Sequence, residues 1–179
     1  MRDEVFKIIV GHGLADWGVA YHGVAGVPGF SCRLSDQALN RFASETLTDL
    51  DIDDPLLVPI VEIATGANMD TREIEPILWK ICQSLSTDLI HSMRVWRAGS
   101  LEAVISTLES DPIYGLSELS GFWSNWGWPY DSPDCMSFEG SGLSVNEYYS
   151  DSNFARVLKE HEAWLDSEIS ILRTLGVSR

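Results

Sequence analysis

Apolar residues recur at intervals of three and four through most of this chain, a spacing typical of helices that bury one face. Helix starts and stops punctuate the pattern: Ser35, Asp54-Pro55 and Asp111-Pro112 precede apolar stripes, and Gly66 and Gly127 follow them. The sequence therefore predicts a mainly all-α fold of about seven helices, arranged as successive antiparallel pairs.

The expected helices are separated by loops of very different length. We expect helices over residues 35–47, 54–66, 70–85, 87–98, 100–108, 111–126 and 153–175. Pro76 is expected to delay the third of these to Glu75, and Gly99 with Ser100 to separate the fourth from the fifth. Residues 5–10 fit either a short N-terminal strand or a first helix. Six glycines and Pro28 indicate a loop over 11–31, and a Gly/Pro/aromatic loop is expected near 127–150.

Length and charge limit the class of protein. The chain has 179 residues, of which 45% are hydrophobic, so we expect a single helical domain over 1–179. A formal net charge of -15 disfavours nucleic acid and anionic membranes as partners, because both require a positive patch. A basic protein is the expected partner; the alternative is that the acidity only keeps the protein soluble.

The three cysteines, Cys32, Cys82 and Cys135, form no CxxC pair, so neither a disulfide framework nor a zinc site is indicated. The apolar run of residues 5–10 is interrupted by Lys7 and is too short for a signal sequence or a membrane span. We therefore expect a cytoplasmic protein.

Residues 98–155 contain no Lys, Arg or His, but many carboxylates and large aromatic residues. Phe122, Trp123 and Trp126 lie on a predicted helical stripe and are expected in the core. Trp128 and Tyr130 flank Pro129 outside that stripe, where an aromatic residue is harder to bury. We expect a partner-binding surface there, with acidic groups from a second loop in a supporting role. Its predicted residues are Trp128, Tyr130, Asp131, Asp134 and Glu139, and secondarily Asp49, Asp51 and Asp53.

Signs of catalysis are weak. The glycines from Gly11 to Gly18 lack the spacing and the strand–helix context of a dinucleotide-binding fingerprint. His12, Asp16, His22 and Cys32 do not have the spacing of a metal-ligand motif, and no GxSxG or P-loop is present. We expect no enzymatic activity, cofactor or metal; a hydrolase-type site built from His12, Asp16 and His22 is the alternative.

Several motifs together resemble a family of small bacterial proteins known as a domain of unknown function. They are Asp16-Trp17-Gly18, the helical middle through Trp79, Asp111-Pro112-Ile113-Tyr114 and Trp128-Pro129-Tyr130. Such proteins look like the immunity proteins of bacterial polymorphic toxin systems. The resemblance implies a chain that binds and occludes a toxin domain; a helical adaptor is the alternative function.

The resemblance covers roughly residues 10–138, so we expect a family-like core over 1–138. The sequence departs from the family pattern after Phe138. A loop and a C-terminal helix are expected over 139–179.

Overall fold

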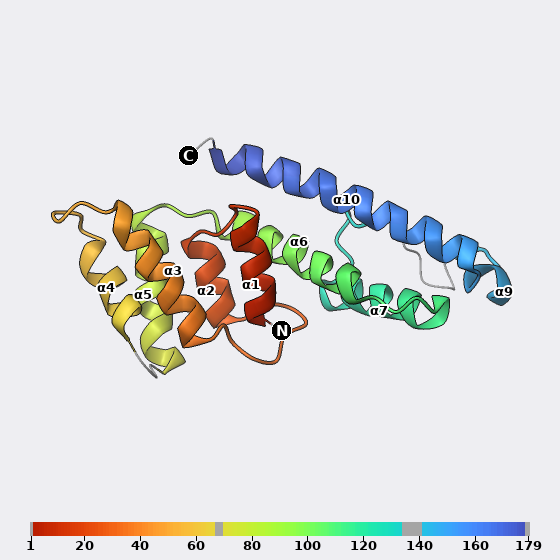
Figure 1. Ribbon diagram of the computed structural model, residues 1–179, viewed down its shortest axis with the longest axis horizontal. Coiled ribbons are helices and arrows are strands. Elements are labelled where there is room, and N and C mark those ends of the chain that lie inside the picture. The colour runs from red at the N-terminus through yellow and green to blue at the C-terminus, as the bar shows by residue number, and fades with distance from the viewer. Residues whose placement is uncertain (1, 67–69, 134–140, 178–179) are drawn as a thin grey trace. The chain divides into compact units, whose positions relative to one another are not determined.

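The computed structural model describes residues 2–66, 70–133 and 141–177 (Figure 1). The chain separates into two compact units, Met1–Trp96 (unit 1) and Arg97–Arg179 (unit 2), and each is described by itself. The prediction of a single domain stays a prediction.

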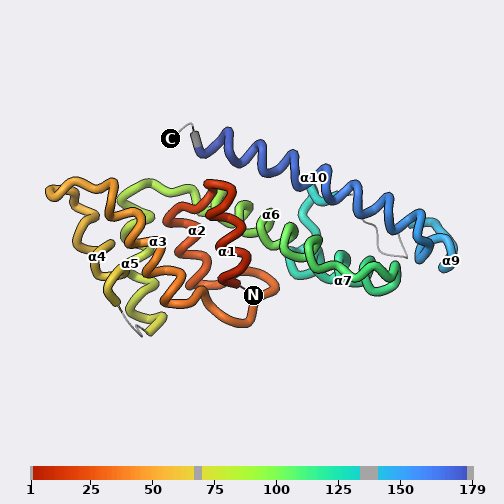
Figure 2. The backbone as a smooth tube through the Cα atoms, in the orientation of Figure 1, coloured from red at the N-terminus to blue at the C-terminus, as the bar shows by residue number. Residues whose placement is uncertain are grey.

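The described residues form nine α-helices and one 3₁₀ helix and include no strand, so the all-α prediction is confirmed. The tube view follows the backbone through these helices (Figure 2). None of the described helices is long and apolar enough to cross a membrane.

In unit 1, the described residues form six elements and the first part of a seventh. They are α1 (Arg2–Gly11), α2 (Trp17–Ala25), α3 (Asp36–Thr46), η1 (Leu47–Asp49), α4 (Leu57–Thr65), α5 (Thr71–Ser84) and the start of α6 (Leu89–Thr107). The first segment, which fits a strand or a helix by sequence, is the helix α1. Its buried side chains, Val5, Phe6 and Ile9, follow the helical three-and-four spacing.

The prediction of a loop over residues 11–31 was wrong, because α2 lies inside this range. The Asp16 carboxylate accepts a hydrogen bond from the Val19 N–H at 2.7 Å and caps the helix. Its glycines provide room for neighbouring side chains and do not form turns. A Cβ on Gly18 would overlap the Ser92 hydroxyl, and one on Gly23 would lie 3.0 Å from the Trp96 ring. Close packing explains these two glycines, whereas Gly13, Gly26 and Gly29 have positive φ as the loop prediction expects.

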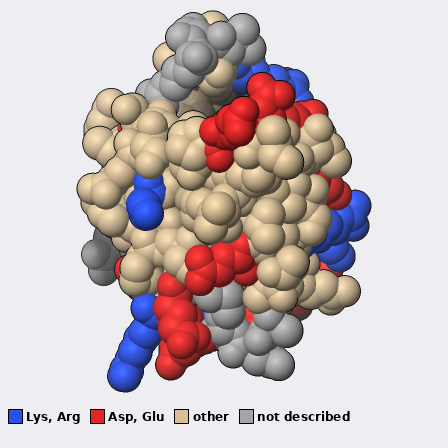
Figure 3. Space-filling view, turned by 90° about the vertical axis from the view of Figure 1, so that its left-hand side faces the viewer, with Lys and Arg blue, Asp and Glu red and all other residues tan. Residues whose placement is uncertain are grey.

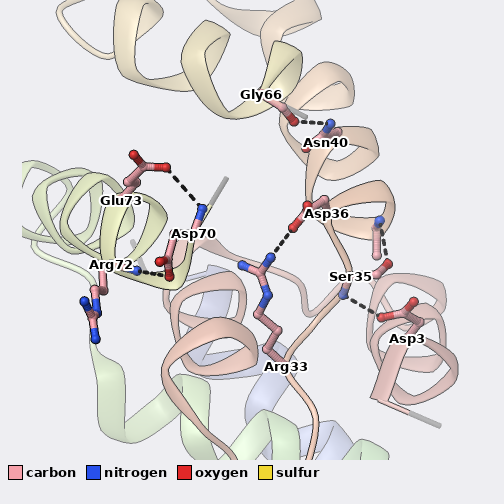
Figure 4. Close-up of polar contacts among 10 residues, drawn as sticks. Asp3, Arg33, Ser35, Asp36, Asn40, Gly66, Asp70, Arg72 and Glu73 are labelled. Carbon is pink, nitrogen blue, oxygen red and sulfur yellow. Dashed lines mark hydrogen bonds and ion pairs between the residues drawn. The ribbon is translucent and has the colours of Figure 1, made fainter. Parts of the chain in front are cut away.

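Local caps define α3 and α5 (Figure 4). Ser35 caps α3 through the Ala38 N–H and donates its own N–H to Asp3 of α1. Asp70 and Glu73 form a capping box at the start of α5. The expected delay of this helix to Glu75 was wrong: the box satisfies the first-turn donors, and Pro76 is accommodated inside the helix. The helix α4 begins at Leu57, two residues after Pro55, because Asp54 and Pro55 form a turn before it.

The core of unit 1 is rich in aromatic residues. Phe6 stacks on Trp96 at 6.1 Å between ring centroids and meets Phe42 edge-on at 5.7 Å. The Trp96 indole donates to the Val19 carbonyl at 2.8 Å, so the polar end of this buried ring is satisfied. The buried guanidinium of Arg2 donates to the carbonyl oxygens of Gly23 and Phe30 at 2.7 and 3.3 Å.

The described part of unit 2 comprises the rest of α6, α7 (Pro112–Asn125), α9 (Val145–Tyr148) and α10 (Asp151–Val177). The expected break at Gly99 and Ser100 was wrong, because α6 runs through both residues and both are buried. A glycine inside a helix costs about 1 kcal/mol, and packing outweighs that cost here. Likewise α10 begins before Asn153 and includes Gly176. Of the three residues predicted for the core, Phe122 and Trp123 are buried with Leu101, Leu116, Leu119, Tyr148 and Val157, and Trp126 is half-buried against this cluster.

Candidate protein-interaction surfaces

The segment after α7 is shaped by the way that helix ends. The Trp128 N–H donates to the Trp123 carbonyl at 3.0 Å and the Gly127 N–H to the Ser124 carbonyl at 3.1 Å, the two bonds of a Schellman motif. Gly127 has φ +71°, the left-handed conformation that this motif requires. The next residue, Trp128, has φ +51°, which is uncommon for a bulky residue. Pro129 comes directly after it and restricts its backbone further. The backbone therefore holds Trp128 in a strained conformation.

The buried side chain of Arg97 also holds this segment in place. Arg97 of α6 donates from both terminal nitrogens to Asp131, with Nη1–Oδ1 at 3.0 Å and Nη2–Oδ2 at 2.6 Å. Glu168 of α10 lies 3.4 Å from Nη2. The Trp164 indole donates to the Asp131 carbonyl at 2.5 Å, and the guanidinium lies 5.1 Å from the centre of the Trp164 ring. Bidentate and cation–π contacts are geometrically demanding, so they fix Asp131 and the chain on either side of it.

The two aromatic residues of this segment are more exposed than Asp131: Tyr130 is fully exposed and Trp128 is 42% exposed. We call residues 127–133, with these two aromatic side chains, the anchor loop. The structure places Asp131 at the bottom of this loop, with both carboxylate oxygens bonded to Arg97. Two further predicted site residues, Asp134 and Glu139, lie outside the described residues.

The secondary acidic residues, Asp49, Asp51 and Asp53, lie in unit 1 and are exposed. They occupy the end of η1 and the turn after it, in which the Asp54 N–H donates to the Asp51 carbonyl at 3.0 Å. The predicted site is therefore divided between the two compact units, with three carboxylates in unit 1 and the aromatic residues in unit 2.

Exposed apolar residues accompany these carboxylates, a feature that the sequence analysis missed. Ile52 is 86% exposed and Val58, on α4, is 75% exposed. A sequence signal was available: residues 42–71 contain seven carboxylates and no Lys, Arg or His. Figure 3 views the molecule from the end where α4 lies and shows acidic residues above and below an uncharged area.

The residues of the hydrolase alternative serve structural contacts. The Asp16 carboxylate caps α2 and accepts from the Ser92 hydroxyl at 3.0 Å. His22 Nε2 lies 2.9 Å from the Leu89 carbonyl, which can only accept, so this nitrogen carries the proton. Burial lowers the pKa of His22, while the Leu89 hydrogen bond and Asp16 act in the opposite direction. His12 lies in the turn after α1.

In unit 2, His161 is fully buried. The Trp123 indole donates to His161 Nε2 at 2.8 Å, and His161 Nδ1 lies 2.7 Å from the Val157 carbonyl. Since a carbonyl only accepts, Nδ1 carries the proton and Nε2 is the acceptor. Burial lowers the pKa of His161, opposed by the Val157 bond and Glu160. The neutral imidazole is thus built into the core.

Unit 1 also has a groove of about 640 Å³ between α1 and α3. Its lining includes the apolar residues Phe6, Val10 and Phe42, and the ion pairs Lys7–Glu4 and Arg41–Glu45 lie at its edge. Both pairs are exposed and join residues of one helix, so they contribute little to stability. Among the described residues, no group of three His, Cys, Asp or Glu could hold a metal ion.

A sequence model of a bacterial family, described as "Uncharacterized protein conserved in bacteria (DUF2247)", matches residues 6–169. The match continues past Phe138, where we expected the family likeness to end, and includes most of α10. No curated protein and no solved structure matches the chain.

Proposed function

The chain belongs to the bacterial DUF2247 family, and from that premise we propose that it is a cytoplasmic protein of immunity type that binds and occludes a basic toxin domain. Neutralisation would need no turnover, only a complex stable enough to keep the toxin from its target. The anchor loop is the proposed contact, with Trp128 and Tyr130 inserting into the partner.

One observation carries this proposal: two exposed aromatic side chains stand on a loop whose base is fixed. Exposed Trp and Tyr are enriched among the residues that dominate binding energy at protein interfaces. Ordering a mobile loop on binding costs free energy, and a loop already held by a Schellman motif and by Arg97 avoids much of that cost. An aromatic pair with no binding role would not need such support.

Charge supports a basic partner. Unit 1 has 14 acidic and 7 basic residues and unit 2 has 13 and 5, so each unit is strongly negative by itself. Fields of one sign accelerate encounter with an oppositely charged partner and reject like-charged ones. In this proposal Asp131 acts indirectly, by holding the anchor loop, because its oxygens are bonded to Arg97.

The test begins with the genes beside this one in its host. The products of these genes are expressed with and without the full-length protein, and growth is scored. We expect one of them to be toxic and the protein to restore growth. If a neighbouring gene product binds the protein but growth is not restored, the adaptor alternative is favoured. If none of the neighbouring gene products is toxic, the proposal is contradicted.

With a partner in hand, Trp128→Ala and Tyr130→Ala are each expected to weaken the complex by over about 1 kcal/mol. Tyr114→Ala is the matched control, because Tyr114 is also an exposed tyrosine of unit 2, on α7. We expect the association rate to fall with ionic strength, as charge steering requires. Unchanged affinity in both loop variants, with native circular dichroism, would remove the anchor loop from the interface.

A further inference from the structure

The helix α4 is apolar on two sides. Ile60 and Ile63 face the core of unit 1 and are buried, as expected of one apolar stripe. Val58 and Val61, three residues apart and therefore on one side of the helix, are exposed. A helix that is apolar all round is normally buried, so the solvent side of α4 is unusual for a surface helix.

The turn before α4 has the same character. Ile52 lies at the tip of the turn closed by the Asp54 N–H and the Asp51 carbonyl. Turn positions are dominated by Gly, Pro, Asn, Asp and Ser, and a β-branched apolar residue there satisfies neither the turn nor the solvent. A second turn, from Asp54 to Leu57, and the bond from the Leu56 N–H to the Asp54 carboxylate connect this tip rigidly to α4.

Exposed acidic residues neighbour these apolar residues in the chain. Asp51 and Asp53 flank Ile52 in the chain, Glu62 is exposed beside Val61 on α4, and Asp49 precedes the turn. We call Ile52, Val58 and Val61 with these four carboxylates the α4 face.

The charge of the α4 face selects its occupant. A second copy of the chain would bring like charges together, and nucleic acid or an anionic membrane would be repelled. A basic polypeptide with apolar side chains would satisfy both components, because it would cover the valines and the isoleucine while its cations meet the carboxylates.

We propose that the α4 face is a binding surface for a basic polypeptide segment bearing apolar side chains. The α4 face lies wholly in unit 1 and includes no residue of the anchor loop. This proposal therefore does not depend on the immunity proposal.

The test uses the full-length chain and three synthetic peptides of equal length. One is an amphipathic helix of Leu and Lys, the second has Glu in place of Lys, and the third has Ser in place of Leu. Backbone amide resonances are followed by NMR during titration. We expect the Leu/Lys peptide to bind with shifts concentrated in residues 49–62, the Leu/Glu peptide not to bind, and the Lys/Ser peptide to bind far more weakly.

The double variant Ile52→Ser/Val58→Ser is expected to lower the affinity for the Leu/Lys peptide by about tenfold or more. Ile90→Ser is the matched control, since Ile90 is 79% exposed elsewhere in unit 1, and it should leave the affinity unchanged. Equal binding by the double variant, equal binding by the Lys/Ser peptide, or shifts outside residues 49–62 would each overturn the proposal. Self-association of the native chain that the double variant abolishes would also overturn it, in favour of a second copy.

Discussion

Each compact unit buries one arginine, and the two are neutralised differently. In unit 1, Arg2 donates to the backbone carbonyls of Gly23 and Phe30, and burial lowers the pKa of its guanidinium. In unit 2, Arg97 is 8% exposed and binds the carboxylates of Asp131 and Glu168. One cation is thus solvated by peptide dipoles, and the other by side-chain charges. In unit 2, therefore, two of the acidic side chains contribute to internal packing by binding a buried cation.

The half-buried His22 and the buried His161 differ in a parallel way. His22 of unit 1 donates from Nε2 to a backbone carbonyl, and a proton added at Nδ1 leaves that bond in place. His161 of unit 2 accepts the Trp123 N–H at Nε2, the nitrogen that a proton would take. In unit 1, Arg2, His22 and Trp96 all donate to backbone carbonyls. In unit 2, by contrast, the bonds of Arg97 to two carboxylates and the bond from Trp123 to His161 depend on the charge state of a side chain. We therefore expect unit 2 to be the more fragile to substitution and to acid.

The largest expected effect is that of Arg97→Met. The substitution removes the cation that pairs with the half-buried carboxylate of Asp131 and the buried carboxylate of Glu168, and breaking such a pair typically costs about 3–5 kcal/mol. Urea unfolding should register that loss, and hydrogen exchange should place it in unit 2. The anchor loop should lose protection with it.

Arg2→Met is the matched control in unit 1. The hydrogen bonds of Arg2 end on neutral carbonyl acceptors, and the Gly23 carbonyl keeps its bond from the Leu34 N–H. We expect a smaller loss, of about 1–3 kcal/mol. If Arg2→Met proves as costly as Arg97→Met, the contrast between the two units fails.

The sequence predicted those helices whose signals are local. Ser35, Asp70 and Asp111 cap α3, α5 and α7 through bonds to residues two or three positions away, so the chain itself contains the whole signal. The errors at α2 and α6 have one cause. Gly18 and Gly99 are glycines inside helices, and in a sequence glycine indicates a turn. At Gly18, the neighbour that leaves no room for a side chain is Ser92, more than seventy positions away.

The candidate site divides in the same way. The exposure of Trp128 and Tyr130 was predicted from Gly127 and Pro129, which lie just past the end of α7, where glycine and proline are common. That Asp131 is bonded to Arg97, 34 positions earlier, could not be derived, because nothing local links the two. The exposure of Ile52 was also hidden, since an apolar residue between aspartates is compatible with burial or with solvent.

Smaller effects are expected where helices approach closely. A Cβ at Gly18 in unit 1 would lie 2.8 Å from Thr87 Cγ2, and one at Gly115 in unit 2 would lie 2.9 Å from the Glu109 carbonyl and 2.6 Å from the Phe154 ring. Gly18→Ala and Gly115→Ala should each lower the free energy of unfolding by about 1–3 kcal/mol through overpacking. Thermal unfolding of the full chain measures both.

Gly121→Ala is the control for these substitutions. Gly121 lies on α7 with Gly115, but a Cβ there would meet nothing within 4 Å. Alanine should stabilise the protein by about 0.5–1 kcal/mol, because it restricts the unfolded chain and favours helix. A gain in stability from Gly115→Ala would mean that Phe154 moves aside freely, and that unit 2 is less tightly packed than unit 1.

The smallest and most discriminating effect concerns acid. Burial lowers the pKa of His161 below the ordinary value of about 6.5. Above that value His161 is neutral in both states and adds no pH dependence. As the pH falls below it, the unfolded chain takes up a proton that the folded chain refuses, so the free energy of unfolding falls until the lowered pKa of the folded state is reached. Protonation of the folded state then breaks the bond from Trp123, a neutral contact worth about 0.5–1.5 kcal/mol.

Burial also lowers the pKa of His22, which gives unit 1 a loss of the same sign but leaves the Leu89 bond intact. Hydrogen exchange between pH 7 and pH 5 should therefore show α7 and α10 losing protection before α2 does. His161→Gln should remove that difference while His22→Gln preserves it, and acid loosening that begins in α2 would reverse the order of fragility inferred for the two units.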